Sequence, residues 1–196
     1  MIENVLTKKG FSFKAKITIK SIIAAGLVAL AVILPQLFHL FAGASAGVKW
    51  LPMYIPVLLG GCLLGWKFGL IVGIASPVMS FAITSAFGNP MPALQRLPFM
   101  ILELSVFAVV SGLFSDKIYK NVWLAFPAVI LAEICGRGIF MLAVTIFQSV
   151  TPFTPAMIWG QIQTGLIGLF IQAAIIPFIV VGLKTAIDKD NDKDND

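Results

Sequence analysis

Apolar residues form six long blocks along this chain of 196 residues, and short clusters of Gly, Pro, Ser, Thr and charged residues separate the blocks. A helix needs about 20 consecutive apolar residues to cross a bilayer, and most of the blocks approach that length. The pattern therefore predicts an all-α membrane protein with six transmembrane helices. The predicted spans are residues 21–42, 51–66, 68–87, 97–114, 122–148 and 156–183.

The second and third blocks combine high apolarity with many Pro and Gly residues. Because Pro52 and Pro56 open the second block, we expect the chain to enter the membrane as extended chain before it becomes helical. The pair Gly60 and Gly61 allows close approach of a neighbouring helix. Irregular backbone at membrane depth is tolerated chiefly where it is buried in protein or lines a cavity. We therefore expect this segment to form the wall of a membrane-embedded pocket.

Composition excludes a soluble globule, because 59% of the residues are hydrophobic and only 12% are charged, whereas globular domains carry about 25% charge. The expected organisation is a basic cytoplasmic segment (1–20), a transmembrane substrate-binding domain (21–184) and a disordered acidic tail (185–196). This leaves no room for a nucleotide-hydrolysing domain. The net charge of +5 does not predict a nucleic-acid partner, since the basic residues lie at the expected membrane edges.

The distribution of lysine and arginine predicts the orientation. Eleven lysines lie in the N-terminal segment, the even-numbered loops and the tail, whereas the opposite side carries only Lys49 and Arg96. The positive-inside rule then places both termini of a multi-pass plasma-membrane protein in the cytoplasm. The alternative of a cleaved signal sequence ending at Ala46 is weakened by its apolar run, which is longer than the usual core of about 7–15 residues.

Three charged residues lie inside the predicted spans: Glu103, Glu133 and Arg137. A charge at the bilayer centre costs at least ~2.5 kcal/mol, so each should face the interior of the bundle and find a partner. Glu133 and Arg137 are spaced i, i+4, which allows either a structural ion pair or a role for Arg137 in contacting a ligand. Glu103 has no partner nearby in the sequence, so Arg137 or the ligand must serve it.

Polar and aromatic residues gather within a turn or two of the predicted external loops. For the aromatic residues, an interfacial position explains this as well as ligand binding does, and Met53 suits packing. His39 is the only histidine, which argues against a multi-histidine metal site. The candidate substrate-binding residues, including two of the three intramembrane charges, are Gln36, His39, Trp50, Met53, Tyr54, Asn89, Arg96, Glu103, Arg137 and Gln161.

Small residues on the first predicted helix indicate helix docking. Ala25 and Ala29 form a small-xxx-small pair, and Gly26 beside them widens the smooth surface. Alanine is common in any span, so the pair is a weak signal by itself.

Motifs for catalysis are absent from the sequence. It contains no Walker loop, no HExxH and no ordered Ser, His and Asp triad. We therefore predict no enzyme activity, no catalytic residue, no metal and no cofactor.

Several blocks of the sequence are similar to a known family. They are LPQLFHLFAGASAGVKWLPMYIPVLLGGCLLGWKFGLIVGIASPVMSF, LPFMILELSVFAVVSGLF, CGRGIF and GLIGLFIQAAIIPFIV, which together extend from Leu34 to Val180. They resemble the substrate-binding S component of energy-coupling factor (ECF) vitamin importers. The resemblance implies a six-helix bundle whose pocket opens outward beneath the first, third and fifth loops. Tyr54 departs from the family, in which related sequences often have His at that position.

The resemblance also implies partners and a substrate class. S components associate with a transmembrane coupling protein and two ABC ATPases, and by analogy Ala25 and Ala29 would dock the coupling protein. Pantothenate is the favoured vitamin, and cobalamin and haem are alternatives carried on the same scaffold. A stand-alone secondary transporter or channel and a ligand-free membrane scaffold are alternatives from other classes. Six spans without a visible repeat argue against inverted-repeat transport.

Overall fold

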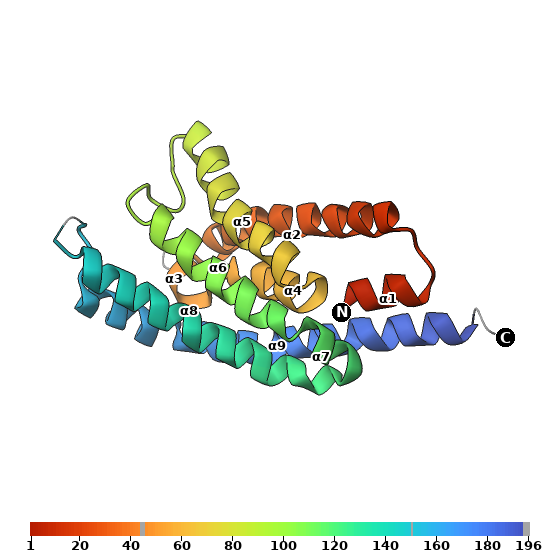
Figure 1. The fold of residues 1–196 in the computed structure, drawn as a ribbon. Helices are drawn as coiled ribbons and strands as arrows, with labels where there is room; N and C mark the ends of the chain where they lie inside the picture. The colour runs from red at the N-terminus through yellow and green to blue at the C-terminus, as the bar shows by residue number, and fades with distance from the viewer. Residues whose placement is uncertain (44–45, 150, 194–196) are drawn as a thin grey trace.

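The computed structural model describes residues 1–43, 46–149 and 151–193, and every regular element in those ranges is a helix (Figure 1). The elements are α1 (Ile2–Lys8), α2 (Phe13–Ala42), α3 (Ala46–Trp50), α4 (Tyr54–Leu64), α5 (Trp66–Ala86), α6 (Leu97–Leu113), α7 (Ser115–Lys120), the 3₁₀ turn η1 (Val122–Leu124), α8 (Ala125–Phe147) and α9 (Pro155–Lys193).

Four of the described segments are long and apolar enough to cross a membrane: α2, α5, η1 with α8, and α9. The remaining two predicted spans correspond to the shorter apolar helices α4 and α6. The prediction of an all-helical, multi-pass membrane protein is confirmed. The count of six spans stays a prediction, because α4 and α6, with 11 and 17 residues, are short of the usual length.

Two predicted boundaries differ from the structure. Helix α2 begins at Phe13, where the Ser12 side chain caps it by accepting a hydrogen bond from the Ala15 N–H at 3.3 Å. At the other end of the chain, α9 continues to Lys193 through a region predicted to be disordered. An ion pair of Lys184 with Asp188, one turn further on at 2.6 Å, stabilises this extension. Residues 194–196 of the predicted tail lie outside the described residues.

Helix α4 lies at the centre of the bundle and contacts α2, α5, α6, α8 and α9. Its residues are buried except for the half-buried Ile55. Glycine makes this possible, because a Cβ on Gly61 would lie 1.9 Å from the Ser111 Oγ of α6 and a Cβ on Gly69 would lie 2.9 Å from the Gly61 Cα. The predicted burial of this Gly-rich segment is confirmed. The extended entry is not, since α3 and a turn precede Tyr54.

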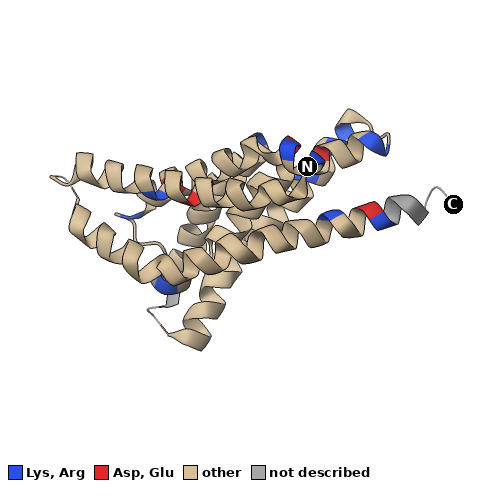
Figure 2. Ribbon diagram, turned by 90° about the horizontal axis from the view of Figure 1, so that it is seen from below, with Lys and Arg blue, Asp and Glu red and all other residues tan. Residues whose placement is uncertain are grey.

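The two ends of the bundle differ in charge. Figure 1 shows both termini at one end and the α5–α6 and α8–α9 loops at the other. Lys and Arg gather at the end with the termini, whereas the helices between are nearly free of charge (Figure 2). Helix α1 folds back there, where Glu3 pairs with Lys20 of α2 at 2.8 Å. The hydrogen bond from Lys20 lowers the pKa of the Glu3 carboxyl.

Candidate substrate-binding site

A cavity of about 350 Å³ lies at the end of the bundle that carries the α5–α6 and α8–α9 loops. Its walls come from α2, α3, the turn before α4, the start of α4, α5, the α5–α6 loop, α6 and the α8–α9 loop. The lining residues are Pro35, His39, Gly47, Leu51, Pro52, Met53, Tyr54, Ser80, Met91, Pro92, Ala93, Arg96, Met100 and Phe153. Small-molecule sites are typically concave, mostly apolar and supplied with a few polar groups, as this cavity is.

The base of the cavity rests on a buried polar network. The Tyr54 hydroxyl donates a hydrogen bond to the Glu103 Oε2 at 2.9 Å, and the Glu103 Oε1 lies 3.0 Å from the Arg137 Nη1. The Arg137 guanidinium also lies 5.1 Å from the centre of the Tyr54 ring. Tyr54 lines the cavity, whereas Glu103 and Arg137 do not. The expectation that Arg137 serves Glu103 is confirmed, and the pair lies behind Tyr54.

The close ion pair that the i, i+4 spacing of Glu133 and Arg137 allows does not form, although the two charges attract each other at longer range. Among the described residues the ion pair of Arg137 is with Glu103, and the buried Glu133 Oε1 has no hydrogen-bond partner. The spacing places both side chains on one face of α8 but does not fix the rotamer of a long arginine. The fully buried Glu103 on α6 offers the guanidinium a closer counter-charge.

Arg96 is the cation that lines the cavity. Its Nη2 donates a hydrogen bond to the Gln161 Oε1 of α9 at 2.8 Å, and its guanidinium lies 5.8 Å from the centre of the Phe140 ring. The Arg96 Nε is buried without a hydrogen-bond partner. An oriented guanidinium with an unused donor suits a carboxylate ligand.

His39 reaches the cavity from α2. Gly47 packs directly against its ring, because a Cβ at that position would lie 2.9 Å from the His39 Nε2. His39 and Arg96 thus bring two nitrogen-bearing side chains from separate segments of the chain to one cavity.

Helix α9 is hydrogen-bonded to the segment just before α4 that forms part of the cavity wall. The Gln172 Nε2 donates hydrogen bonds to the backbone oxygens of Trp50 at 2.7 Å and Leu51 at 3.1 Å. Gly168 lets this segment approach, because a Cβ there would lie 2.5 Å from the Lys49 carbonyl oxygen. The sequence did not single out Gln172, although a Gln deep inside an apolar span is itself a signal.

Side chains of α5 anchor the α5–α6 loop at Met91. The Ser80 hydroxyl donates to the Met91 carbonyl oxygen at 2.7 Å, and the Met91 N–H donates to the Thr84 Oγ1 at 2.7 Å. On either side of this anchor, Asn89 and Ala93 are exposed. Backbone hydrogen bonds add to this anchor, since the Asn89 N–H donates to the Thr84 carbonyl oxygen at 3.1 Å and the Arg96 N–H to the Ala93 carbonyl oxygen at 2.8 Å.

We expect the loop at residues 88–96 to become more ordered when substrate binds. Segments with few internal contacts are the usual lids, and Met91, Pro92 and Ala93 already line the cavity. Amide hydrogen exchange of residues 88–96 should slow at least threefold at saturating ligand, while α7 serves as the internal control. Exchange that is unchanged in the loop at saturation would contradict this expectation.

The predicted site residues fall into three groups. His39, Met53, Tyr54 and Arg96 line the cavity. Gln161 contacts Arg96, and Glu103 and Arg137 support Tyr54. The remaining three lie outside the lining: Trp50 packs against Phe38, Asn89 is exposed, and the buried Gln36 Nε2 has no partner. The apolar lining residues Met100 and Phe153 were missed, because nothing in the sequence distinguishes them from other apolar residues.

Comparison with known proteins gives one match. The family model for the ECF transporter, substrate-specific component, matches residues 20–180. No curated protein and no solved structure matches the chain.

Proposed function

Because the chain belongs to the family of ECF transporter substrate-specific components, we propose that its cavity captures a small carboxylated vitamin outside the cell. Members of this family are substrate-capturing subunits of importers and not enzymes. The observation that carries the proposal is Arg96, a cation that lines an otherwise mostly apolar cavity and whose guanidinium donates to the neutral Gln161. A carboxylate would supply the counter-charge.

The size of the cavity favours a compact ligand. At about 350 Å³ it lies near the lower end of the range of ligand pockets, about 300–1,000 Å³. Pantothenate fits this size and has one carboxylate for Arg96 and hydroxyl and amide groups for His39 and Tyr54. Cobalamin and haem are macrocycles too large for the cavity as it stands. No observation in the structure favours a stand-alone transporter or channel.

Import also requires partners and an orientation. The Lys and Arg residues at the end with the termini support cytoplasmic termini in the plasma membrane (Figure 2). The chain has no ATPase motif, so a transmembrane coupling protein and two ABC ATPases would supply the energy. Ala25 and Ala29 are exposed on α2 and are the proposed docking surface for the coupling protein.

Calorimetric titration with pantothenate and with its alcohol analogue panthenol tests the proposed site. We expect Arg96→Gln to weaken pantothenate binding by roughly 10- to 100-fold, because a hydrogen bond to a charged group contributes about 1.5–3 kcal/mol. Panthenol, which lacks the carboxylate, should bind weakly to both proteins. Lys49→Gln is the matched control, since Lys49 is exposed and does not line the cavity. Equal affinity of wild type and Arg96→Gln would contradict the proposed site.

A further inference from the structure

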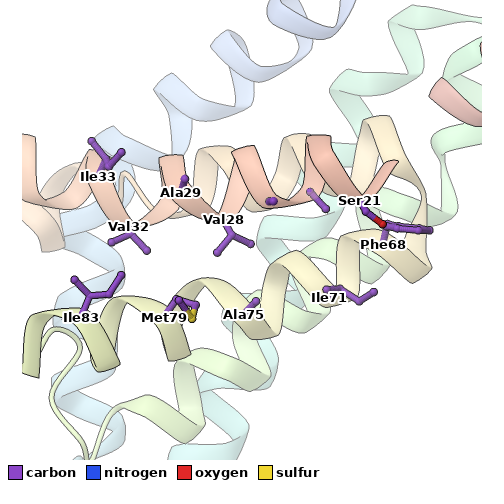
Figure 3. Close-up of a pocket in the computed structure, with 12 residues that line it drawn as sticks. Ser21, Val28, Ala29, Val32, Ile33, Phe68, Ile71, Ala75, Met79 and Ile83 are labelled. Carbon is purple, nitrogen blue, oxygen red and sulfur yellow. The ribbon is translucent and has the colours of Figure 1, made fainter. Parts of the chain in front are cut away.

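A second, larger cavity of about 610 Å³ lies as a groove between α2 and α5, where Ile33, Ile71 and Met79 are exposed. Figure 3 shows side chains of the two helices lining it from Ser21 and Phe68 at one end to Ile33 and Ile83 at the other. Ser21 is its one lining residue with a polar side chain. The remaining lining residues are Ala24, Ala25, Val28, Ala29, Val32, Ile71, Ala75 and Met79.

The length of the groove matches one leaflet. Residues 21 to 33 of α2 line it, and a helix rises about 1.5 Å per residue, which gives roughly 18 Å. One leaflet contributes about half of the ~30 Å hydrocarbon core. The end at Ser21 is the end that carries the termini and most of the lysines.

A cationic cavity of about 330 Å³ adjoins the groove at that end, and Phe68 lines both. Lys16, Lys20 and Lys67 line this cavity together with two acidic residues, Glu3 and Asp116. Lys20 is held by Glu3 at 2.8 Å and lies 4.6 Å from the centre of the Phe68 ring.

The other two lysines make weaker contacts. The Lys16 Nζ donates to the Thr7 Oγ1 at 2.9 Å, and the Lys67 Nζ lies 5.6 Å from the centre of the Trp66 ring. Neither contact neutralises the charge, and Glu3, which attracts Lys16, already pairs with Lys20. Both ammonium groups can therefore pair with an anion at the mouth of the groove.

We infer that an anionic phospholipid of the cytoplasmic leaflet occupies this site, with its phosphate at Lys16 and Lys67 and one acyl chain along the groove. The inference rests on the arrangement of the two cavities, in which a cationic cavity leads into an apolar groove. A phospholipid has the matching arrangement, with an anionic head group followed by an apolar chain about one leaflet long. A helix of a partner protein would match the groove but not the cationic cavity. A zwitterionic lipid has no net charge to offer the lysines.

A consequence for docking rests on the proposed function. Ala25 and Ala29 line the groove, so the acyl chain and the coupling protein cannot occupy it together. The bound lipid would then compete with docking, and anionic lipid would raise the concentration of coupling protein needed for assembly.

Native mass spectrometry of the purified chain with dioleoyl phosphatidylglycerol or dioleoyl phosphatidylcholine tests the inference. We expect wild type to retain one phosphatidylglycerol in preference to phosphatidylcholine. Lys16→Gln with Lys67→Gln should reduce that retention about tenfold, whereas Lys117→Gln with Lys120→Gln, on α7 outside both cavities, should not. Ala75→Phe, which fills the groove, should also reduce retention, and Ala174→Phe on an exposed face of α9 should leave it unchanged.

Ala75→Leu provides a milder filling of the groove if Ala75→Phe lowers the folded yield. Equal retention of the two lipids by wild type would overturn the inference. So would loss of phosphatidylglycerol in the lysine variant with full retention in both Ala75 variants, since that pattern indicates attraction to surface charge alone. A dimer mass without lipid would overturn it as well and assign the groove to a second copy of the chain. Pantothenate titration of the same samples reports separately on the proposed function.

Discussion

Replacing Arg137 with methionine is expected to lower the free energy of unfolding by about 3–5 kcal/mol, because it leaves the fully buried Glu103 without its counter-charge. Removing one partner of a buried pair costs more than replacing both partners with neutral residues. The double change Glu103→Gln with Arg137→Met should therefore recover most of the lost stability, since the introduced glutamine amide can still accept the hydrogen bond from Tyr54. Thermal unfolding of the detergent-purified variants measures both effects.

Glu133→Gln is the matched control for this experiment. Its carboxylate is buried on the same face of α8 but has no ion pair among the described residues, so neutralising it should leave stability unchanged or raise it slightly. A loss as large as that of Arg137→Met would show that Glu133 is the true partner. Ligand titration of the double variant then shows whether the Glu103–Arg137 pair supports Tyr54 or contacts the ligand itself. Affinity within about threefold of wild type would mean that the pair only supports Tyr54, and its loss would mean that these charges contact the ligand.

Ala25→Trp or Ala29→Trp is expected to reduce uptake by cells at least tenfold while ligand affinity stays near that of wild type. A bulky side chain on this smooth surface prevents close approach of a partner helix. The ligand cavity is remote, because Ala29 and His39 are ten residues apart on α2, or roughly 15 Å along the helix axis. Ala174→Trp is the control, since Ala174 is exposed on α9. Pull-down of the coupling protein at wild-type levels by both α2 variants would contradict the proposed docking surface.

The sequence predicted the parts of the fold that depend on local physics. Long apolar runs, the pair Gly60 and Gly61, and the need of Glu103 for a counter-charge each follow from the cost of burying polar groups or crowding helices at membrane depth. The same reasoning predicted that His39 and Arg96 lie at one end of the bundle, and the structure places both on one cavity.

Long-range geometry accounts for what the sequence did not predict. Gln172 acts on the carbonyl groups of Trp50 and Leu51, which are more than 120 residues away in the chain. Only the packing of α9 against α3 brings them together. The rotamer of Arg137 likewise depends on the neighbouring helix α6, which explains why spacing alone paired it wrongly. The continuation of α9 to Lys193 was not predicted, because the prediction for the tail rested on its acidic composition and not on the helix that precedes it.

Native mass measurement of the chain purified from cells grown in rich medium tests whether the cavity captures a carboxylated vitamin. We expect one small molecule per chain, with the mass of a carboxylated vitamin such as pantothenate, and its loss from Arg96→Gln but not from Lys49→Gln. Wild-type protein that carries no small molecule even after incubation with a vitamin mixture, or an adduct that Arg96→Gln retains in full, would contradict the proposed function.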